Sequence, residues 1–75
     1  MKIKSDVDCL DFLSRVKACR GEVIFKSNEG DLLNLKSVLS QYVFAAVMER
    51  REFISSGEIV CKDEADYAVL SDFLQ

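Results

Sequence analysis

The sequence contains no histidine, no proline and no tryptophan. Without histidine, a Ser-His-Asp triad, a histidine-ligated metal and a phosphohistidine relay are all excluded. The longest uncharged run, residues 37–48, has twelve residues, far fewer than the ~20 apolar residues that span a bilayer. The lack of histidine therefore excludes these mechanisms. The short uncharged run predicts that no segment crosses a membrane.

Cysteine is scarce, and Cys9, Cys19 and Cys61 are the only three in the chain. Their separations of ten and forty-two residues include no C-x-x-C pair, so neither a disulfide framework nor a zinc knuckle is expected. In a reducing compartment such residues behave as small buried hydrophobes. We expect no metal site and no cofactor, and the reactivity of the thiols stays open.

The balance of charge is slightly acidic. Ten Lys and Arg residues against thirteen Asp and Glu residues give a net charge of -3, which opposes attraction to nucleic acid phosphates and to an anionic lipid surface. The first six residues lack the apolar core of a secretory signal. We therefore expect a cytoplasmic protein that binds neither nucleic acid nor membrane.

The chain has 75 residues, of which 49% are hydrophobic and 31% charged. This composition is typical of globular domains and not of disordered chains. A chain of this length has room for one small core. We predict a single domain over residues 1–75.

The first predicted elements are a strand and a helix. Residues 1–4 alternate weakly and are expected to form a short strand. Ser5 and, three residues later, Asp8 give the Ser-x-x-acid pattern of a helix start, and the helix is expected to end near residue 20. Its apolar stripe consists of Val7, Leu10, Leu13 and Val16, with Phe12 beside them.

A hairpin and a second helix follow. Residues 22–26 and 31–35 are the predicted strands, and Gly30 in the turn can accept a positive φ. Which of the leucines in the second strand faces inward stays open. Ser37 is the natural N-cap of a helix that runs towards residue 50 or 51. Its stripe consists of Val38, Leu39, Tyr42, Val43, Ala46 and Val47.

A fourth strand and a third helix complete the predicted order. Residues 58–61 follow a Ser-Ser-Gly turn signal, and Asp63 stands three residues before Asp66 at a helix start. The order β-α-β-β-α-β-α predicts the α+β fold class. The expected architecture is an open-faced two-layer β-sandwich, in which three helices cover one face of a four-stranded antiparallel sheet.

One segment carries a resemblance to a known family. Residues 34–39 read Asn-Leu-Lys-Ser-Val-Leu, which resembles the Asn-Leu-Lys-Ser-Ile-Met segment around the regulatory serine of HPr proteins from low-GC Gram-positive bacteria. HPr is the small histidine-containing phosphocarrier of the bacterial sugar phosphotransferase system. Residues 12–37 can be laid on such an HPr without a gap, and residues 57–74 are similar in pattern only. The family fold, four strands under three helices, agrees with the predicted order.

The chain departs from HPr where HPr accepts phosphate. HPr uses a histidine near the start of its first helix in a His-x-Arg-Pro context, and here the loop is shortened to residues 4–7 and contains none of these residues. We therefore expect no enzymatic activity and no phosphoryl transfer from Enzyme I. An alternative acceptor is Asp6, but an aspartyl phosphate needs a metal-binding acidic pocket. Asp6, Asp8 and Asp11 fit better as residues that compensate a helix dipole.

Ser37 matches the regulatory serine and is the candidate phosphorylation site. As an N-cap, its hydroxyl would accept a backbone hydrogen bond worth ~1 kcal/mol relative to alanine. The resemblance implies phosphorylation by an HPr kinase, and a phosphate at a helix N-terminus meets oriented N–H groups and the positive end of the dipole. Lys36 adds a nearby cation. Arginines of a partner, such as a transcriptional regulator, could then bind the phosphoserine.

The second helix also carries the predicted docking residues. Tyr42 and Phe44 are two positions apart, so they point in different directions, and one of them would be exposed. The resemblance implies docking here too, because HPr meets its partners with its first and second helices; a wide buried face is the alternative. We predict a partner-binding surface made of Lys36, Val38, Tyr42 and Phe44.

These observations predict a non-catalytic HPr-like binding or regulatory module of a phosphotransferase-type system, with Ser37 as its switch. Its partners are expected to be phosphotransferase-system or transcriptional regulatory proteins. Two alternatives stay open: a phosphocarrier with a non-histidine acceptor, and a homodimeric structural protein that buries its open sheet face or its second helix. The expected state is a monomer or a weak homodimer.

Overall fold

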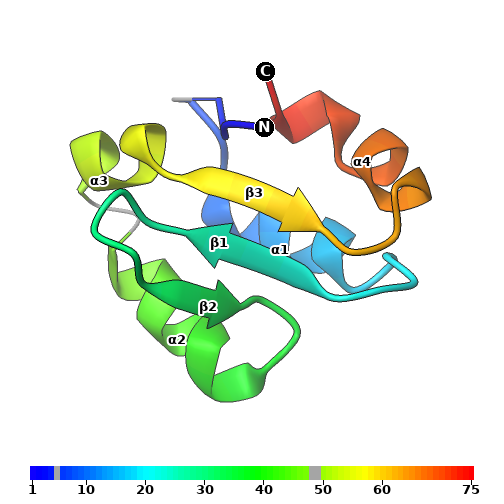
Figure 1. Cartoon of the computed structure of the whole chain (residues 1–75), viewed down its shortest axis with the longest axis horizontal. Helices are drawn as coiled ribbons and strands as arrows, with labels where there is room; N and C mark the ends of the chain where they lie inside the picture. The colour runs from blue at the N-terminus through cyan, green and yellow to red at the C-terminus, as the bar shows by residue number, and fades with distance from the viewer. Residues whose placement is uncertain (5, 48–49) are drawn as a thin grey trace.

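Three antiparallel strands and four α-helices make up this small α+β fold, within the residues that the structure describes (Figure 1). The computed structural model describes residues 1–4, 6–47 and 50–75. Along the chain the elements are α1 (Cys9–Val16), β1 (Val23–Lys26), β2 (Leu32–Asn34), α2 (Val38–Val47), α3 (Arg51–Ser56), β3 (Glu58–Cys61), α4 (Ala65–Val69) and the 3-10 helix η1 (Ser71–Phe73).

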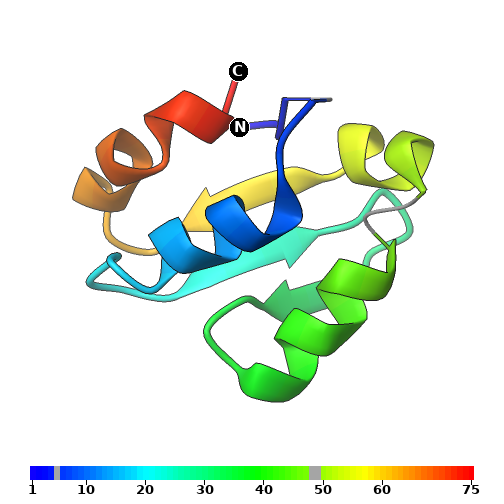
Figure 2. The same cartoon turned by 180° about the vertical axis from the view of Figure 1, so that it is seen from behind.

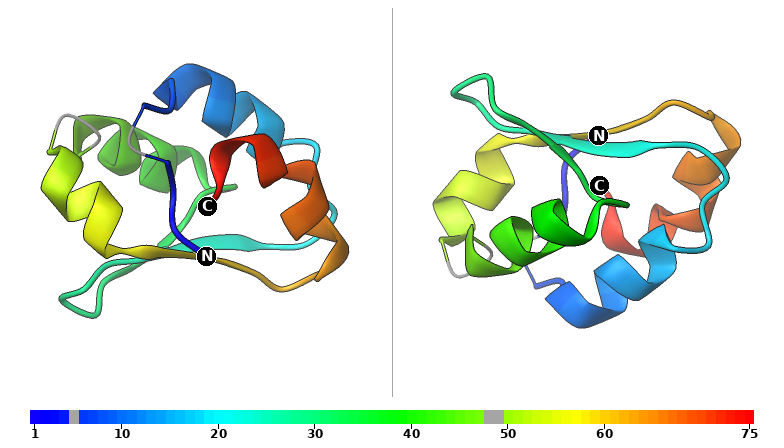
Figure 3. Two further views of the ribbon diagram at one scale, coloured as in Figure 1. Left: turned by 90° about the horizontal axis from the view of Figure 1, so that it is seen from above. Right: turned by 90° about the horizontal axis from the view of Figure 1, so that it is seen from below.

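The sheet has the strand order β2-β1-β3, and the helices lie on one side of it (Figures 2 and 3). Phe25 in the central strand is paired with Leu33 on one side and with Ile59 on the other. These side chains point towards the helices, whereas Lys26 and Glu58 are exposed on the opposite face. The sheet is therefore covered on one face and open on the other.

The predicted hairpin is present, and its turn explains why. Gly30 has a φ of 93°, which glycine adopts without a steric penalty. The Ser27 hydroxyl accepts hydrogen bonds from the N–H groups of Glu29 and Asp31, at 3.2 and 3.0 Å. In the second strand Leu32 points to solvent, whereas Leu33 is half-buried against the core.

The predicted first strand is wrong in detail. Of residues 1–4, Ile3 alone forms a β-bridge, and it is an isolated one with Leu74. Met1 exchanges two backbone hydrogen bonds with Ile59 of β3, of 2.6 and 3.2 Å. The segment is thus paired with β3 at Met1 and with the C-terminal residues at Ile3. The Met1–Ile59 and Ile3–Leu74 pairings each involve a single residue of this segment, which is too short for a strand. The described part of the sheet therefore has three strands.

The helices also differ from the prediction, since the described chain has four α-helices instead of three. The extra helix, α3, occupies residues where a turn was expected. Phe53 and Ile54 pack it against the core, with the Phe53 ring 5.8 Å from the Phe25 ring. Gly57 ends it, and a Cβ there would overlap the Phe25 ring and lie 2.9 Å from the Lys26 carbonyl oxygen. Glycine is therefore required for β3 to begin so close to β1.

Helix α1 begins later than the sequence predicts. Asp8 is its N-cap, and the carboxylate accepts hydrogen bonds from the N–H groups of Leu10 and Asp11, at 2.9 and 3.2 Å. The predicted cap, Ser5, lies outside the described residues. Leu10 was expected in the core, but it is exposed, and the buried residues of α1 are Phe12, Leu13 and Val16.

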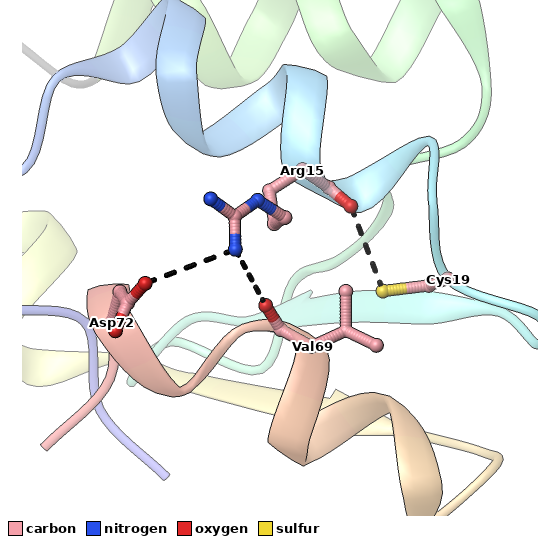
Figure 4. Close-up of polar contacts among 4 residues, drawn as sticks. All are labelled: Arg15, Cys19, Val69 and Asp72. Carbon is pink, nitrogen blue, oxygen red and sulfur yellow. Dashed lines mark hydrogen bonds and ion pairs between the residues drawn. The ribbon is translucent and has the colours of Figure 1, made fainter.

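Arg15 joins α1 to the C-terminal elements. Its guanidinium donates a hydrogen bond of 3.3 Å to the Val69 carbonyl and lies 3.8 Å from the Asp72 carboxylate (Figure 4). The same group lies 5.5 Å from the centre of the Phe73 ring. The predicted final helix is divided here, because α4 ends at Val69 and the chain continues as η1.

Aromatic rings form the centre of the core. Phe12, Phe25 and Phe44 are fully buried, and Phe44 touches both of the others. The core therefore joins α1, β1 and α2. Within the described ranges, no helix reaches the length and hydrophobicity that a membrane span requires.

Candidate docking site

Five large apolar side chains lie exposed on the described parts of α1 and α2, and we call four of them, Leu10, Val38, Leu39 and Tyr42, the α1–α2 face. The exposed fraction is 76% for Leu10, 66% for Val38, 74% for Leu39 and 74% for Tyr42. Leu10, Val38 and Tyr42 also line a groove of about 230 Å³ between the two helices. Large exposed apolar patches mark interaction sites on soluble proteins. This face is the strongest candidate for a functional site.

Phe44 decides which side of α2 faces the core. Its ring centre lies 5.8 Å from that of Phe12 and 5.4 Å from that of Phe25. Each helical residue turns by about 100°, so Tyr42, two positions earlier, points almost directly away from Phe44. The predicted core stripe of α2 therefore largely faces solvent. The prediction of Phe44 as a partner-binding residue is wrong, because its side chain is fully buried.

The segment that carries the family resemblance forms the turn between β2 and α2. The Asn34 side chain accepts a hydrogen bond from the N–H of Lys36, and its carbonyl accepts one from the N–H of Ser37, both of 3.0 Å. Leu35 is fully buried, and its carbonyl accepts a bond of 2.9 Å from the side chain of Gln41. These contacts fix the turn, and they hold Ser37 immediately before α2.

Ser37 is exposed at the N-terminus of α2. Its carbonyl accepts a hydrogen bond of 2.9 Å from the N–H of Gln41, as expected for an N-cap position. Among the described residues no hydrogen bond to its hydroxyl is seen, so the side-chain cap stays a prediction. N–H groups in the first turn of a helix have no intrahelical acceptor. A phosphate on this hydroxyl would therefore lie beside oriented donors.

Lys36 is partly buried and connects the two helices. Its ammonium group donates a hydrogen bond to the carbonyl of Cys19 in the loop after α1. The start of α2 is thereby held next to the end of α1. Lys36 borders the α1–α2 face. Its ammonium group stabilises the fold through the bond to Cys19, and Lys36 is also the cation next to Ser37 in the chain.

Asp66 is a buried carboxylate whose role the sequence did not reveal. One oxygen accepts a hydrogen bond of 2.9 Å from the N–H of Arg20, and the other accepts one of 2.8 Å from the N–H of Gly21. These two bonds lower the pKa of Asp66, and the nearby charges of Lys36 and Arg20 act in the same direction. The residues are 46 and 45 positions apart in the chain, so no local pattern indicates the contact.

The cysteines offer little reactivity. Cys19 and Cys61 are buried, and burial raises the pKa of both thiols, that of Cys61 to about 11. The nearby carboxylate of Asp66 raises both further. A thiol with a raised pKa stays protonated at neutral pH and is a poor nucleophile. Cys9 is half-buried on α1 and packs against the core.

The acidic residues near the start of α1 form no metal site in the part of the chain that the structure describes, where no group of three ligating side chains could hold a metal ion. Asp8 is occupied as the N-cap of α1, and Asp6 is exposed. The structure therefore gives Asp6 no acidic pocket among the described residues.

Comparison with known proteins adds no relative: no family model matches the chain, and neither a curated protein nor a solved structure matches it. The function is therefore inferred from the chain's own residues.

Proposed function

We propose that this protein is a non-catalytic binding and regulatory module related to HPr, which docks protein partners on the α1–α2 face and is switched by phosphorylation at Ser37. The observation that carries the proposal is the juxtaposition of an exposed serine with an uncovered apolar face. Val38, Leu39 and Tyr42 lie within the first two turns after Ser37 and are all exposed. The partners would be phosphotransferase-system or transcriptional regulatory proteins in the cytoplasm.

The fold is proposed to be a variant of the HPr open-faced sandwich. The pairings of Met1 with Ile59 and of Ile3 with Leu74 stand where the first strand of such a fold would lie. Helix α3 is then an addition between the second helix and the last strand. The open sheet face and the turn of residues 34–37 support this relationship.

Phosphorylation would change the charge at one end of the docking face. A phosphoserine carries about -1.5 to -2 charges at neutral pH, and the first turn of α2 has no acidic residue to repel it. The N–H groups and the positive end of the helix dipole would stabilise the phosphate. A partner that places arginines beside the apolar face would then bind the phosphorylated form more tightly.

The kinase reaction tests this proposal directly. We expect an HPr kinase with ATP to add one phosphoryl group to the wild-type chain, detected by intact-mass measurement, and none to Ser37→Ala. Ser40→Ala is the matched control, because Ser40 lies on the same helix and should leave modification unchanged. An unmodified wild-type chain, under conditions that modify an authentic HPr, would contradict the switch.

Docking is tested separately by a pull-down from the source organism. Tyr42→Ala should weaken the capture of partners, and Ser37→Asp should change which partners are captured. Leu32→Ala is the matched control, because Leu32 is 64% exposed but lies on the open face of the sheet. Equal capture by all three variants and the wild type would place docking elsewhere.

A further inference from the structure

We propose that the outer edge of β2, the edge away from β1, binds an extended peptide segment of another protein. The segment adds a strand to the sheet and inserts one large apolar side chain between β2 and α2. Strand β2 lies at the edge because the sheet order is β2-β1-β3, and α2 packs beside it (Figures 1 and 2). This site is separate from the α1–α2 face, and it does not depend on modification of Ser37.

The hydrogen bonds of the hairpin determine which backbone groups of β2 point towards β1. In an antiparallel pair, residues that exchange hydrogen bonds alternate with residues whose N–H and C=O groups point away from the partner strand. The N–H of Ser27 donates to the Asp31 carbonyl, and the N–H of Leu35 donates to the Val23 carbonyl, at 2.9 and 2.8 Å. Leu33 lies midway between Asp31 and Leu35, so its backbone groups also face β1.

Leu32 and Asn34 therefore direct their backbone groups to the outer edge. The Asn34 carbonyl accepts the N–H of Ser37, and the groups that remain are the N–H and C=O of Leu32 and the N–H of Asn34. Among the described residues no hydrogen bond to these groups is seen. A peptide in a strand conformation supplies the matching acceptors and donor from its own backbone.

The other edge of the sheet is covered differently. Met1 exchanges two backbone hydrogen bonds with Ile59 of β3, so the start of the chain occupies part of that edge. No described segment pairs with β2 on its outer side. An edge with unpaired N–H and C=O groups is a template for another strand. The outer edge of β2 thus selects an extended segment and not a helix.

An apolar pocket adjoins this edge on the helical side of the sheet. Its volume is about 260 Å³, and its lining includes Leu32 and Leu33 of β2, Val43 and Val47 of α2, and Phe53 of α3. The Val43 side chain is 43% exposed, so the pocket is open to solvent. Pockets that hold whole small molecules measure ~300–1,000 Å³. The smaller volume here suits a single large side chain.

The register predicts which residue of the peptide enters the pocket. The residue opposite Leu33 would form a non-hydrogen-bonded pair, in which side chains lie closest together. Directly opposite residues share one face of a sheet, and Leu33 faces the helical layer and packs against the core. The peptide residue opposite Leu33 is therefore expected to be large and apolar, and its two neighbours point to the open face, where polar side chains are tolerated.

A second copy of this chain fits the site less well than a separate peptide. If two β2 edges paired about a twofold axis at Leu33, the residue opposite Leu33 would be the same leucine of the other copy. That side chain already packs against its own core, so the pocket would stay unfilled.

Charge does not select the occupant. Asp31 lines the pocket, whereas Lys26 pairs with Leu32 and Arg50 lies over the Phe53 ring. Because these charges have both signs, backbone hydrogen bonds and one apolar contact carry the recognition.

A series of blocked heptapeptides tests the site by NMR titration of the isotope-labelled protein. Each peptide has lysine at both ends and threonines, which favour strands, around a central alanine, valine, leucine or phenylalanine. We expect the leucine or phenylalanine peptide to shift the amide signals of Leu32 and Asn34, to slow their exchange, and to bind at least about tenfold more tightly than the alanine peptide. N-methylation of the residue after the central one should abolish binding, because that N–H would donate to the Leu32 carbonyl.

Variants of the protein locate the pocket and the edge. Val43→Asp should weaken binding of the leucine peptide at least about tenfold, because it places a charge in the pocket. Val38→Asp is the matched control, since Val38 is 66% exposed on the same helix but does not line this pocket. Leu32→Pro removes an outward N–H at the first residue of an edge strand, where proline is tolerated, and should also weaken binding. Leu32→Thr keeps the N–H and should bind as the wild type does.

Three results would overturn the inference. The first is no shift of either amide with any peptide up to about 1 mM. The second is equal binding of the leucine, alanine and N-methylated peptides, which the wild-type protein tests even if a variant fails to fold. The third is slow exchange of Leu32 and Asn34 that increases with protein concentration alone, which would show that a second copy occupies the edge. Each leaves modification of Ser37 untouched.

Discussion

Asp66 is the residue that ties the loop after α1 to α4. Both of its carboxylate oxygens accept backbone hydrogen bonds, from Arg20 and from Gly21. Gly21 permits the approach, since a Cβ there would lie 3.1 Å from the Cβ of Asp63. A single side chain in α4 thereby positions the loop that also supplies the Cys19 carbonyl to Lys36. The position of Lys36 at the start of α2 depends on this arrangement.

The lowered pKa of Asp66 predicts a specific dependence of stability on pH. The ordinary value is 3.8, and the folded value lies below it. The stabilisation by the carboxylate is therefore fully present above the unfolded pKa and is lost as the pH falls through the folded pKa. We expect the free energy of unfolding, measured in urea, to fall below about pH 4, and Asp66→Asn to be less stable at neutral pH and to show a weaker fall.

The comparison needs a matched carboxylate elsewhere. Asp31→Asn removes an exposed carboxyl in the hairpin turn, and it should keep the wild-type dependence in the acid range. The variant at Asp66 loses one of two acceptors, because an amide offers a single acceptor oxygen. Parallel curves for the wild type and Asp66→Asn would show that the two backbone hydrogen bonds do not depend on the charge.

At the scale of elements, α2 makes the sharpest prediction, because two aromatic residues on it face opposite ways. Phe44→Ala removes a fully buried ring from the centre of the core and should cost about 3–5 kcal/mol in the free energy of unfolding. Tyr42→Ala truncates a side chain that is 74% exposed, and its cost should stay within about 0.5 kcal/mol. Urea unfolding of both variants measures the difference. Similar losses would mean that α2 is rotated relative to the core.

The elements that could be predicted from the sequence are those with local signals. The hairpin follows from Gly30 between two β-rich runs, and β3 follows from the turn signal before Glu58. The position of Ser37 at the start of a helix is also confirmed. In each case the turn or cap residues lie within a few positions of the element that they define, so no distant contact is needed to recognise them.

The orientation of α2 could not be predicted, because it depends on contacts with residues that are distant in the sequence. Its apolar residues occupy all sides, so periodicity cannot select the buried one. The choice is made by Phe44, which meets rings from α1 and β1. Helix α3 was missed because Phe53 and Ile54 precede a Ser-Ser-Gly sequence that is typical of a turn. Its stability comes from packing against Phe25, which lies far away in the sequence.

At the scale of the whole molecule, the two ends of the described chain lie side by side. The N–H of Lys4 donates to the Phe73 carbonyl and the N–H of Gln75 donates to the Lys2 carbonyl, each at 2.9 Å. The side chain of Ile3 is 1% exposed, so the segment before α1 belongs to the core. We call this pairing of residues 2–4 with residues 73–75 the clasp. It holds the helical layer over the edge of the sheet at β3.

The clasp predicts that the first residues unfold together with the rest of the protein. Ile3→Ala should cost about 2–5 kcal/mol, a large part of the 5–15 kcal/mol typical of whole domains. The amide protons of Lys4 and Gln75 should exchange as slowly as that of Leu35, which bonds to the Val23 carbonyl in the centre of the fold. Met1→Ala is the control, since Met1 is half exposed and its truncation should change stability by no more than about 0.5 kcal/mol. Fast exchange at Lys4 with a small cost for Ile3→Ala would show that these residues fray independently, and the core would then rest on the sheet and on helices α1, α2 and α4 alone.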